Sequence, residues 1–132
     1  MESLFLLFIS LLLSTMVGVQ TKARDTERQT DIKAMHAQIE AYYAQNGKYP
    51  TLENINDPGW RGINMKGLDD EALVDPKNNS KEIISTPKDG SYSYEVYSSS
   101  NTTCDNVTSD CEQYTLTAIL DDGQTYKKQN LN

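Results

Sequence analysis

Apolar residues follow two different patterns in the first third of the chain. Nearly every residue in 4–19 is apolar, and no comparable run occurs later. Residues 22–45 contain neither Pro nor Gly, and apolar side chains recur there at steps of three and four, which predicts one apolar stripe on an amphipathic helix. The stripe consists of Ile32, Met35, Ile39, Tyr42 and Tyr43. Asn46-Gly47 is a C-cap signal, with Pro50 shortly beyond. We expect one helix over about residues 2–45, wholly apolar in its first half.

Charged residues flank this stripe at spacings that suit ion pairs between successive helical turns. They are Arg24, Asp25, Glu27, Arg28, Asp31, Lys33 and Glu40. At ~1.5 Å per residue the whole helix would be ~65 Å long. A helix of that length is longer than a small domain needs, so we expect it to protrude.

The last third of the chain alternates between apolar and polar residues, which predicts strands. We expect them at residues 92–97, 114–120 and 125–128, with Asp122-Gly123 as a hairpin turn. Three antiparallel strands offer one apolar face, and the helix stripe can cover it. The predicted fold class is therefore α+β: a long N-terminal helix packed on a small C-terminal antiparallel sheet.

The middle, residues 48–90, holds most of the Gly and Pro and is expected to be an irregular connection with short turns and one helical turn over 69–74. A chain of 132 residues is long enough for one domain. We divide it into a long helix, 1–47, with an apolar part (1–21) and an amphipathic part (22–47), and a globular head, 48–132. Trp60 is expected to anchor its loop against this head, or else to be an exposed contact residue.

The net charge of −7 argues against nucleic-acid binding by the subunit alone, because phosphate contacts need clustered Lys and Arg. Lys127-Lys128 is the only adjacent cationic pair. The acidity is typical of an exposed surface that must stay soluble.

The apolar block suits either a retained membrane helix or a secretory signal peptide. As a helix it would be about 24 Å long, somewhat short of a ~30 Å hydrocarbon core. A secretory signal peptide needs a cationic start and a small-x-small cleavage site. Glu2 is the only charge before the block, and residues 16–21 contain no Ala-x-Ala sequence, so the sequence favours a retained helix.

Cys104 and Cys111 flank a polar loop. Their spacing suits neither a zinc knuckle nor a CxxC redox pair, and in a cytosolic protein they would be two free thiols or half a metal site. If the head lies outside the cytoplasm, a disulfide is the better interpretation. It would stabilise the fold by roughly 2–3 kcal/mol.

Candidate catalytic chemistry is sparse. His36 is the only histidine and lies among helix formers beside the stripe, which is typical of a surface or packing role. The sequence has no Gly-x-Ser-x-Gly motif and no phosphate-binding loop. The acidic residues Asp69, Asp70, Glu71 and Asp75 lack EF-hand spacing, so we expect a solvated loop, and Asp121 and Asp122 as turn formers. We expect neither enzyme activity nor a cofactor or metal.

A family likeness rests on two stretches. The mixed-charge residues 22–33, followed by 41–50 with the letters AYYAQNGKYP, resemble bacterial type IV pilins and major pseudopilins. The cysteine pair followed by Tyr114-Thr115-Leu116-Thr117-Ala118 and the Asp-Gly hairpin is similar to pilin C-terminal strands. At the start of the chain, the family has a basic leader ending in Gly and then a glutamate a few residues into the mature chain, whereas Glu2 stands closer to the start.

The resemblance implies that subunits wait in the inner membrane and then join a helical homopolymer, the apolar half-helices packing as its core. The residues implied in this assembly are Glu2, Leu4, Phe5, Leu7, Phe8, Leu11, Leu12, Val17 and Gly18. If Met1 begins the mature chain, Glu2 would neutralise the terminal amine of a neighbouring subunit, or else lie at the membrane interface. Gly18 would permit a kink or close packing against a neighbour.

The implied function is a structural subunit of an extracellular type IV pilus, for adhesion, motility or uptake. The implied partners are copies of the chain, the inner membrane, the pilus assembly machinery and a surface or host-cell receptor. One alternative is the major pseudopilin of a type II secretion system. Another is a secreted or membrane-anchored binding domain.

Overall fold

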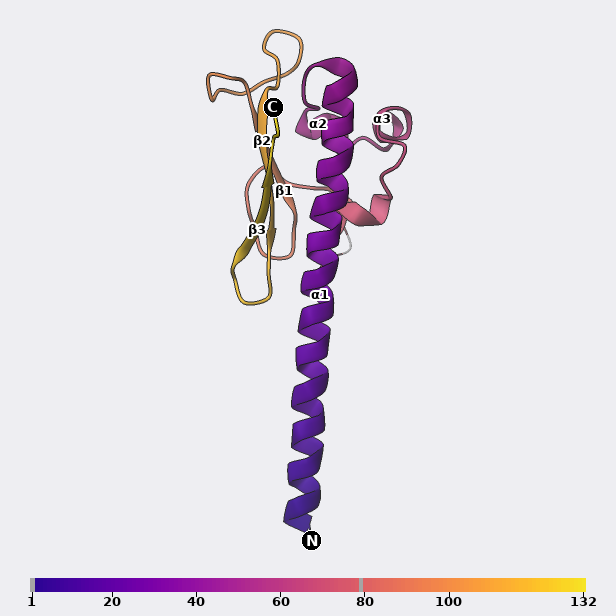
Figure 1. Cartoon of the computed structure of the whole chain (residues 1–132), viewed down its shortest axis with the longest axis vertical. Helices are drawn as coiled ribbons and strands as arrows, with labels where there is room; N and C mark the ends of the chain where they lie inside the picture. The colour runs from indigo at the N-terminus through magenta and orange to yellow at the C-terminus, as the bar shows by residue number, and fades with distance from the viewer. Residues whose placement is uncertain (1, 79) are drawn as a thin grey trace.

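A single long helix forms the axis of the molecule (Figure 1). The computed structural model describes the backbone of residues 2–78 and 80–132, and the side chains of residues 9, 10, 16–78 and 80–132. Helix α1 spans Glu2–Asn46, 45 residues, which corresponds to about 67 Å. Its C-terminal half lies against the head, and its N-terminal half projects away from it. Gly47 ends the helix at φ +72°, and its N–H donates to the Tyr43 carbonyl at 2.7 Å. The predicted C-cap is therefore confirmed.

Three antiparallel strands form one sheet in the order β1-β2-β3. They are β1 (Ser93–Tyr97), β2 (Gln113–Ile119) and β3 (Thr125–Gln129), and the three predicted strands are confirmed. The register pairs Tyr94 with Leu116 and Leu116 with Lys128. Gly123, at φ +85°, forms the β2–β3 turn, a conformation that glycine adopts without steric cost.

The connection between α1 and the sheet is more helical than its Gly and Pro content predicts. It contains α2 (Leu52–Asn56), α3 (Pro58–Asn64) and the 3₁₀ turn η1 (Asp70–Leu73). The η1 turn was expected, but α2 and α3 were not. Thr51 caps α2 in a capping box, and Asp57 caps α3 with Pro58 in the first turn. Pro58-Gly59 therefore opens a helix, because proline is tolerated at the first helical position, where its missing N–H costs nothing.

The hydrophobic core lies between the stripe of α1 and the inner face of the sheet. Ile32, Met35 and Ile39 are each 0% exposed and belong to one cluster with Leu116 and Ala118 of β2. Each fully buried aliphatic side chain contributes about 1.5–3 kcal/mol. This packing fixes the C-terminal half of α1 to the sheet.

A second group of contacts centres on Glu40, which we had expected to make local ion pairs along the helix. Its carboxylate instead accepts hydrogen bonds from the Tyr49 hydroxyl at 2.9 Å, the Tyr114 hydroxyl at 3.2 Å and the Leu131 N–H at 3.0 Å. The Tyr49 ring stacks on Tyr43 and meets Tyr114 edge-on. Glu40 therefore links α1 to the connection, to β2 and to the C-terminal segment. These partners are 9 to 91 positions away in sequence, so local spacing could not reveal them.

Arg28 is the centre of a buried ion cluster near the point where α1 leaves the head. Its side chain is 0% exposed and holds Asp75, also 0% exposed, through two hydrogen bonds of 3.0 and 3.2 Å. It donates to Asp25 and to Asp121, at 2.7 Å each. Arg24 donates to Asp121 at 2.6 Å. We call these five residues the junction cluster.

The junction cluster corrects two expectations. The Asp25–Arg28 pair is of the predicted i,i+3 kind, but Asp75 was expected in a solvated loop and Asp121 was expected only as a turn former. Both carboxylates instead bind α1, because a buried guanidinium needs opposite charges and hydrogen-bond acceptors around it. Burial alone would lower the pKa of Arg28, but the hydrogen bonds to Asp75 and Asp121 outweigh it and raise that pKa. The cluster ties three segments together: α1, the chain after η1, and the β2–β3 turn.

Replacing Arg28 by Met leaves Asp75 buried without its cation. Breaking a buried pair on one side costs about 3–5 kcal/mol, so R28M should lower the free energy of unfolding by that amount in urea titrations of the full chain. Arg24, 34% exposed in its side chain, provides the matched control. R24M should cost no more than about 1 kcal/mol, and equal losses in the two variants would contradict this assignment.

Candidate functional site

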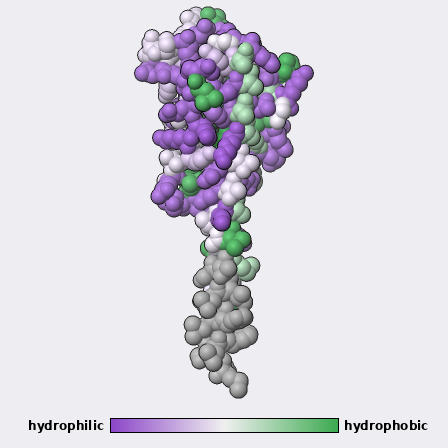
Figure 2. All heavy atoms as spheres, viewed as in Figure 1, coloured by the Kyte–Doolittle hydropathy of each residue, from purple (hydrophilic) through white to green (hydrophobic). Residues whose placement is uncertain are grey.

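The described part of α1 outside the head carries exposed apolar side chains. Met16, Val17 and Val19 are 58%, 61% and 63% exposed, and Ile9 is 38% exposed. Among the described residues, a Cβ at Gly18 would point into open space. Figure 2 shows a largely hydrophilic head, with green surface at the lower end of its coloured part, where the described helix emerges. Within the part of the chain that the structure describes, a single copy leaves these side chains largely uncovered.

Most of the predicted assembly residues lie outside the described side chains. They are Glu2, Leu4, Phe5, Leu7, Phe8, Leu11 and Leu12. Among the described residues, no helix is both long enough and apolar enough to span a membrane.

The side of α1 that faces away from the sheet is lined by small residues. With successive residues 100° apart around the helix, these small residues lie on the side opposite Ile32, Met35 and Ile39. All of the small residues on that side are exposed. We call this the rear face of α1, and it consists of Val19, Ala23, Thr26, Thr30, Ala37, Ala41 and Ala44. A shallow groove of about 540 Å³ runs along its N-terminal part from Val19 to Thr30. Small side chains allow a neighbouring backbone to approach closely.

The rear face was missed from the sequence. Its signal is the recurrence of Ala and Thr at three- and four-residue steps, on the side of the helix opposite the apolar stripe. Because Ala and Thr are small, a pattern defined by large apolar residues does not include these positions.

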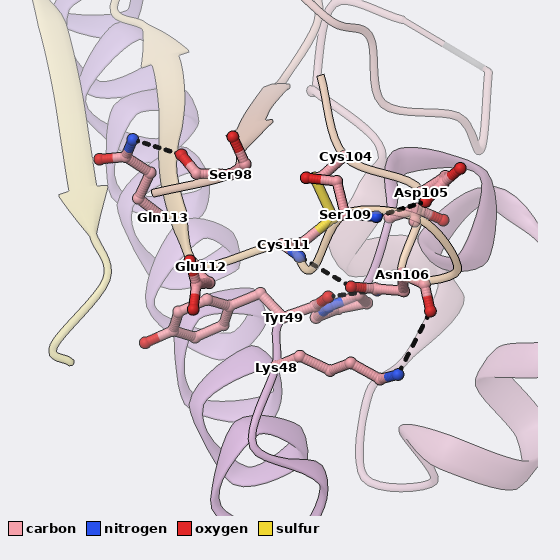
Figure 3. Close-up of a disulfide and its surroundings, with 12 residues drawn as sticks. Lys48, Tyr49, Ser98, Cys104, Asp105, Asn106, Ser109, Cys111, Glu112 and Gln113 are labelled. Carbon is pink, nitrogen blue, oxygen red and sulfur yellow. Dashed lines mark hydrogen bonds between the residues drawn. A yellow bond between two sulfur atoms is a disulfide. The ribbon is translucent and has the colours of Figure 1, made fainter. Parts of the chain in front are cut away.

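A disulfide closes the loop between β1 and β2. Cys104 and Cys111 are joined, with their Cα atoms 5.1 Å apart, so the predicted bond is present (Figure 3). Cys111 is 0% exposed and belongs to the core. The Tyr49 N–H donates to the Cys111 carbonyl at 2.8 Å. The loop is therefore fastened to the chain just after α1.

Two side chains set the shape of this disulfide loop, residues 104–111. The Asp105 carboxylate accepts from the N–H groups of Val107, Thr108 and Ser109 at 2.7–3.1 Å, and these bonds lower its pKa. Asn106, at φ +62°, donates from Nδ2 to the Tyr49 carbonyl and accepts from the Cys111 N–H, at 2.8 Å each. Figure 3 shows the Asn106 side chain between Tyr49 and Cys111. The loop is held in one shape, and Val107 on it is 88% exposed.

Other residues singled out in the sequence lie at the margins of the head. Tyr43 is partly buried against the core, whereas the Tyr42 ring packs 5.0 Å from Trp60 of α3. Trp60 anchors its segment against the core, as expected. His36 lies 2.9 Å from the Gln129 carbonyl of β3. Within the described residues, no group of three or more His, Cys, Asp or Glu side chains is arranged to hold a metal ion.

Comparisons with known proteins identify no relative. A scan against protein-family models, a search of curated proteins and a search of solved structures each found no match to this chain.

One carboxyl group near the junction cluster has a raised pKa. Burial of Asp31 raises its pKa to about 6, against the opposing effect of the Tyr92 hydroxyl, which donates to it at 2.7 Å. Repulsion from Glu27, Asp75 and Asp69 adds to the rise. The pKa of Asp121 moves the other way, lowered by its hydrogen bonds to Arg24 and Arg28.

These shifts predict a pH dependence of stability with two separate windows. Asp31 binds a proton more tightly in the folded protein, where its pKa is about 6, than in the unfolded chain, where its pKa is 3.8. Its contribution to the free energy of unfolding therefore declines as the pH rises from about 4 to about 6. The contribution of Asp121 declines as the pH falls below about 4. D31N should remove the first decline and raise the melting temperature at pH 7 more than at pH 4. Melting curves of wild type and D31N at both values test this, and a parallel shift at the two values would contradict it.

Loss of the disulfide should weaken the whole head. We expect Cys104→Ser with Cys111→Ala to lower the free energy of unfolding by about 2–3 kcal/mol, the entropy of closing so short a loop. Thermal or urea unfolding measures the loss. A control, Val107→Ser, changes only an exposed tip and should stay within about 0.5 kcal/mol of wild type.

Proposed function

We propose that this protein is a structural subunit, of the type IV pilin kind, that polymerises through α1 into an extracellular filament. The observation that carries the proposal is the exposure of Met16, Val17 and Val19 on a helix that projects from a largely hydrophilic head. Apolar surface of this extent in one place marks a lipid or protein contact. Residues 4–15, which precede these side chains in the sequence, continue the same apolar character.

A helix of this kind can exchange one apolar environment for another. Hydrocarbon tails and a bundle of apolar helices are similar solvents for Leu and Phe, so a subunit can leave the membrane for a filament core at a small difference in free energy. The small residues of the rear face let a neighbouring helix come close above that core. Contacts of this head-to-tail type produce an open fibre when they do not close into a ring.

The resemblance of residues 22–33 and 41–50 to pilins supports the same proposal and supplies its biological setting. The subunit would cross the inner membrane once before assembly, would be drawn out by the pilus assembly machinery, and would serve adhesion, motility or uptake through a surface or host-cell receptor. It would have no catalytic role and no nucleic-acid partner as a single subunit.

The first experiment is to shear fibres from the native cells and to analyse their N-terminal sequence and intact mass. Retention of residues 4–19 in fibres supports the filament. A monomeric soluble product that has lost this segment would identify a secreted binding domain and would end the proposal. Fibres that appear only in the periplasm would favour the secretion pseudopilin instead.

A single charge in the exposed apolar part should prevent assembly without harming the head. Val17→Asp places a carboxylate near the end of the apolar stretch, where it costs at most about 2.5–3.5 kcal/mol, the value for the centre of a membrane helix, or at most roughly a hundredfold in an equilibrium. Val17→Leu is the matched control. We expect electron microscopy and immunoblots of the sheared fraction to show filaments for V17L only, with equal melting temperatures of the head. Normal filament yield from V17D would refute this role for α1.

A further inference from the structure

The face of the sheet that points away from α1 carries a polar hollow of about 270 Å³. Side chains alternate between the two faces of a strand, and Tyr94, Tyr114 and Leu116 occupy the buried inner face. Their neighbours along the strands therefore point to the outer face. We call this site the sheet hollow, and the residues that line it from the strands include Glu95 and Tyr97 of β1, Gln113 and Thr115 of β2, and Gln129 of β3.

The strand register brings these residues together across the whole width of the sheet. Tyr97 is opposite Gln113, and Glu95 is opposite Thr115. Thr115 is in turn opposite Gln129. Residues directly opposite each other in an antiparallel pair have Cβ atoms about 4.5–5.5 Å apart. A small ligand in the sheet hollow can therefore contact side chains of all three strands at once.

The Gln113 amide is already fixed in position at one end of the sheet hollow. Its Nε2 donates to the Ser98 carbonyl at 2.7 Å and to Asn101 Oδ1 at 2.6 Å. The turn that carries these acceptors is itself closed by the Asn101 N–H, which donates to the Ser98 carbonyl at 3.0 Å. Figure 3 shows the Gln113 amide oxygen turned away from Ser98. Both amide hydrogens are thus occupied, and the oxygen is left as an ordered acceptor for a ligand.

The remaining groups define the chemistry that the sheet hollow suits. Tyr97 is 37% exposed and supplies one aromatic ring. The Glu95 carboxylate is partly buried, and no described residue donates a hydrogen bond to it or forms an ion pair with it. Within the described part of the chain, the lining includes no cationic side chain. A lone carboxylate disfavours an anionic ligand, whereas the amides and hydroxyls around it exchange hydrogen bonds with neutral groups.

We infer that the sheet hollow binds one ring of a neutral carbohydrate, with the C–H face of the ring against Tyr97 and its hydroxyl groups donating to Gln113 and Glu95. Such a ring combines an apolar face, which suits the electron-rich face of an aromatic side chain, with several hydroxyl donors and acceptors. The volume lies below the roughly 300–1,000 Å³ of pockets for drug-sized ligands. It therefore suits a single ring and not an oligosaccharide.

The sheet hollow is complete in one copy of the chain and does not depend on the proposed function. It lies on the side of the sheet opposite α1, so the contacts that α1 makes in a filament do not cover it. A filament would then display one such hollow on every subunit, and many weak sites on one fibre bind a glycan-coated surface far more tightly than a single site does. In that setting the inference names the class of partner that adhesion would use.

Saturation-transfer NMR of the full chain in an amine-oxide detergent tests the site in single subunits. The detergent must not be a glycoside, because a carbohydrate headgroup would compete. The probes are the methyl glycosides of glucose, galactose, mannose and N-acetylglucosamine at millimolar concentration, since one ring makes few contacts. We expect transfer to the ring protons of at least one of them.

Variants with unchanged melting temperatures assign that signal to the sheet hollow. Tyr97→Ala should weaken binding by roughly fivefold to tenfold, whereas Tyr97→Phe keeps the ring and should stay within about twofold of wild type. Gln113→Leu removes the ordered acceptor and should also weaken binding. The control is Thr125→Ala, which changes an exposed residue of β3 outside the lining and should have no effect.

The outcomes separate this inference from the proposed function. Absence of transfer to all four glycosides, or equal transfer by Tyr97→Ala and wild type, would overturn it. Choline binding that Glu95→Gln abolishes, without binding of any glycoside, would identify a cation site and would overturn it as well. Because the measurement uses single subunits, carbohydrate binding without any filaments in the native cells would leave this inference standing and refute only the proposed function.

Discussion

The whole architecture depends on one helix that must satisfy two different surroundings along its length. In its C-terminal half, one face of α1 packs on the sheet through Ile32, Met35 and Ile39, each fully buried. The opposite face, and the described residues of the N-terminal half, remain exposed. The helix is continuous from Glu2 to Asn46. A displacement of its apolar end is therefore transmitted to the head, because no break in the helix lies between them.

Two polar groups secure that helix at separate levels. Arg28 holds the lower part of the head through Asp75 and Asp121, and Glu40 holds the upper part through Tyr49 and Tyr114. Apolar packing alone resists separation of α1 from the sheet but resists sliding weakly, since it has no preferred direction. Directed hydrogen bonds at two heights fix the position of α1 along its own axis.

The strands, the α1 C-cap and the disulfide could be predicted because each depends on a local signal. Alternation identifies a strand by itself, and Gly47 and Gly123 mark the positions that need a positive φ. The two short helices were missed because Thr51 and Asp57 become caps only when the residues after them turn into helix. Composition alone does not decide between a capped helix and a turn there.

The ion cluster and the Glu40 contacts could not be predicted, for a different reason. Arg28 meets Asp75 and Asp121, 47 and 93 positions away, so the pairing depends on how the head folds back on α1. Local spacing correctly predicted the pairing with Asp25, whereas Asp75 was expected in a solvated loop and Asp121 only in a turn. The spacing of the rear-face residues is visible in the sequence, but small residues contribute little to a hydrophobic pattern.

The left-handed asparagine of the disulfide loop has a consequence for chemical modification. Asn106-Val107-Thr108 is a triplet of the kind that accepts N-linked sugar. Attachment of sugar replaces a hydrogen on the side-chain amide nitrogen, and in Asn106 that nitrogen is already donating to the Tyr49 carbonyl. The amide keeps its second N–H when a sugar is attached, so the bond that fastens the loop to the end of α1 persists only if the sugar replaces the hydrogen that does not point at the Tyr49 carbonyl.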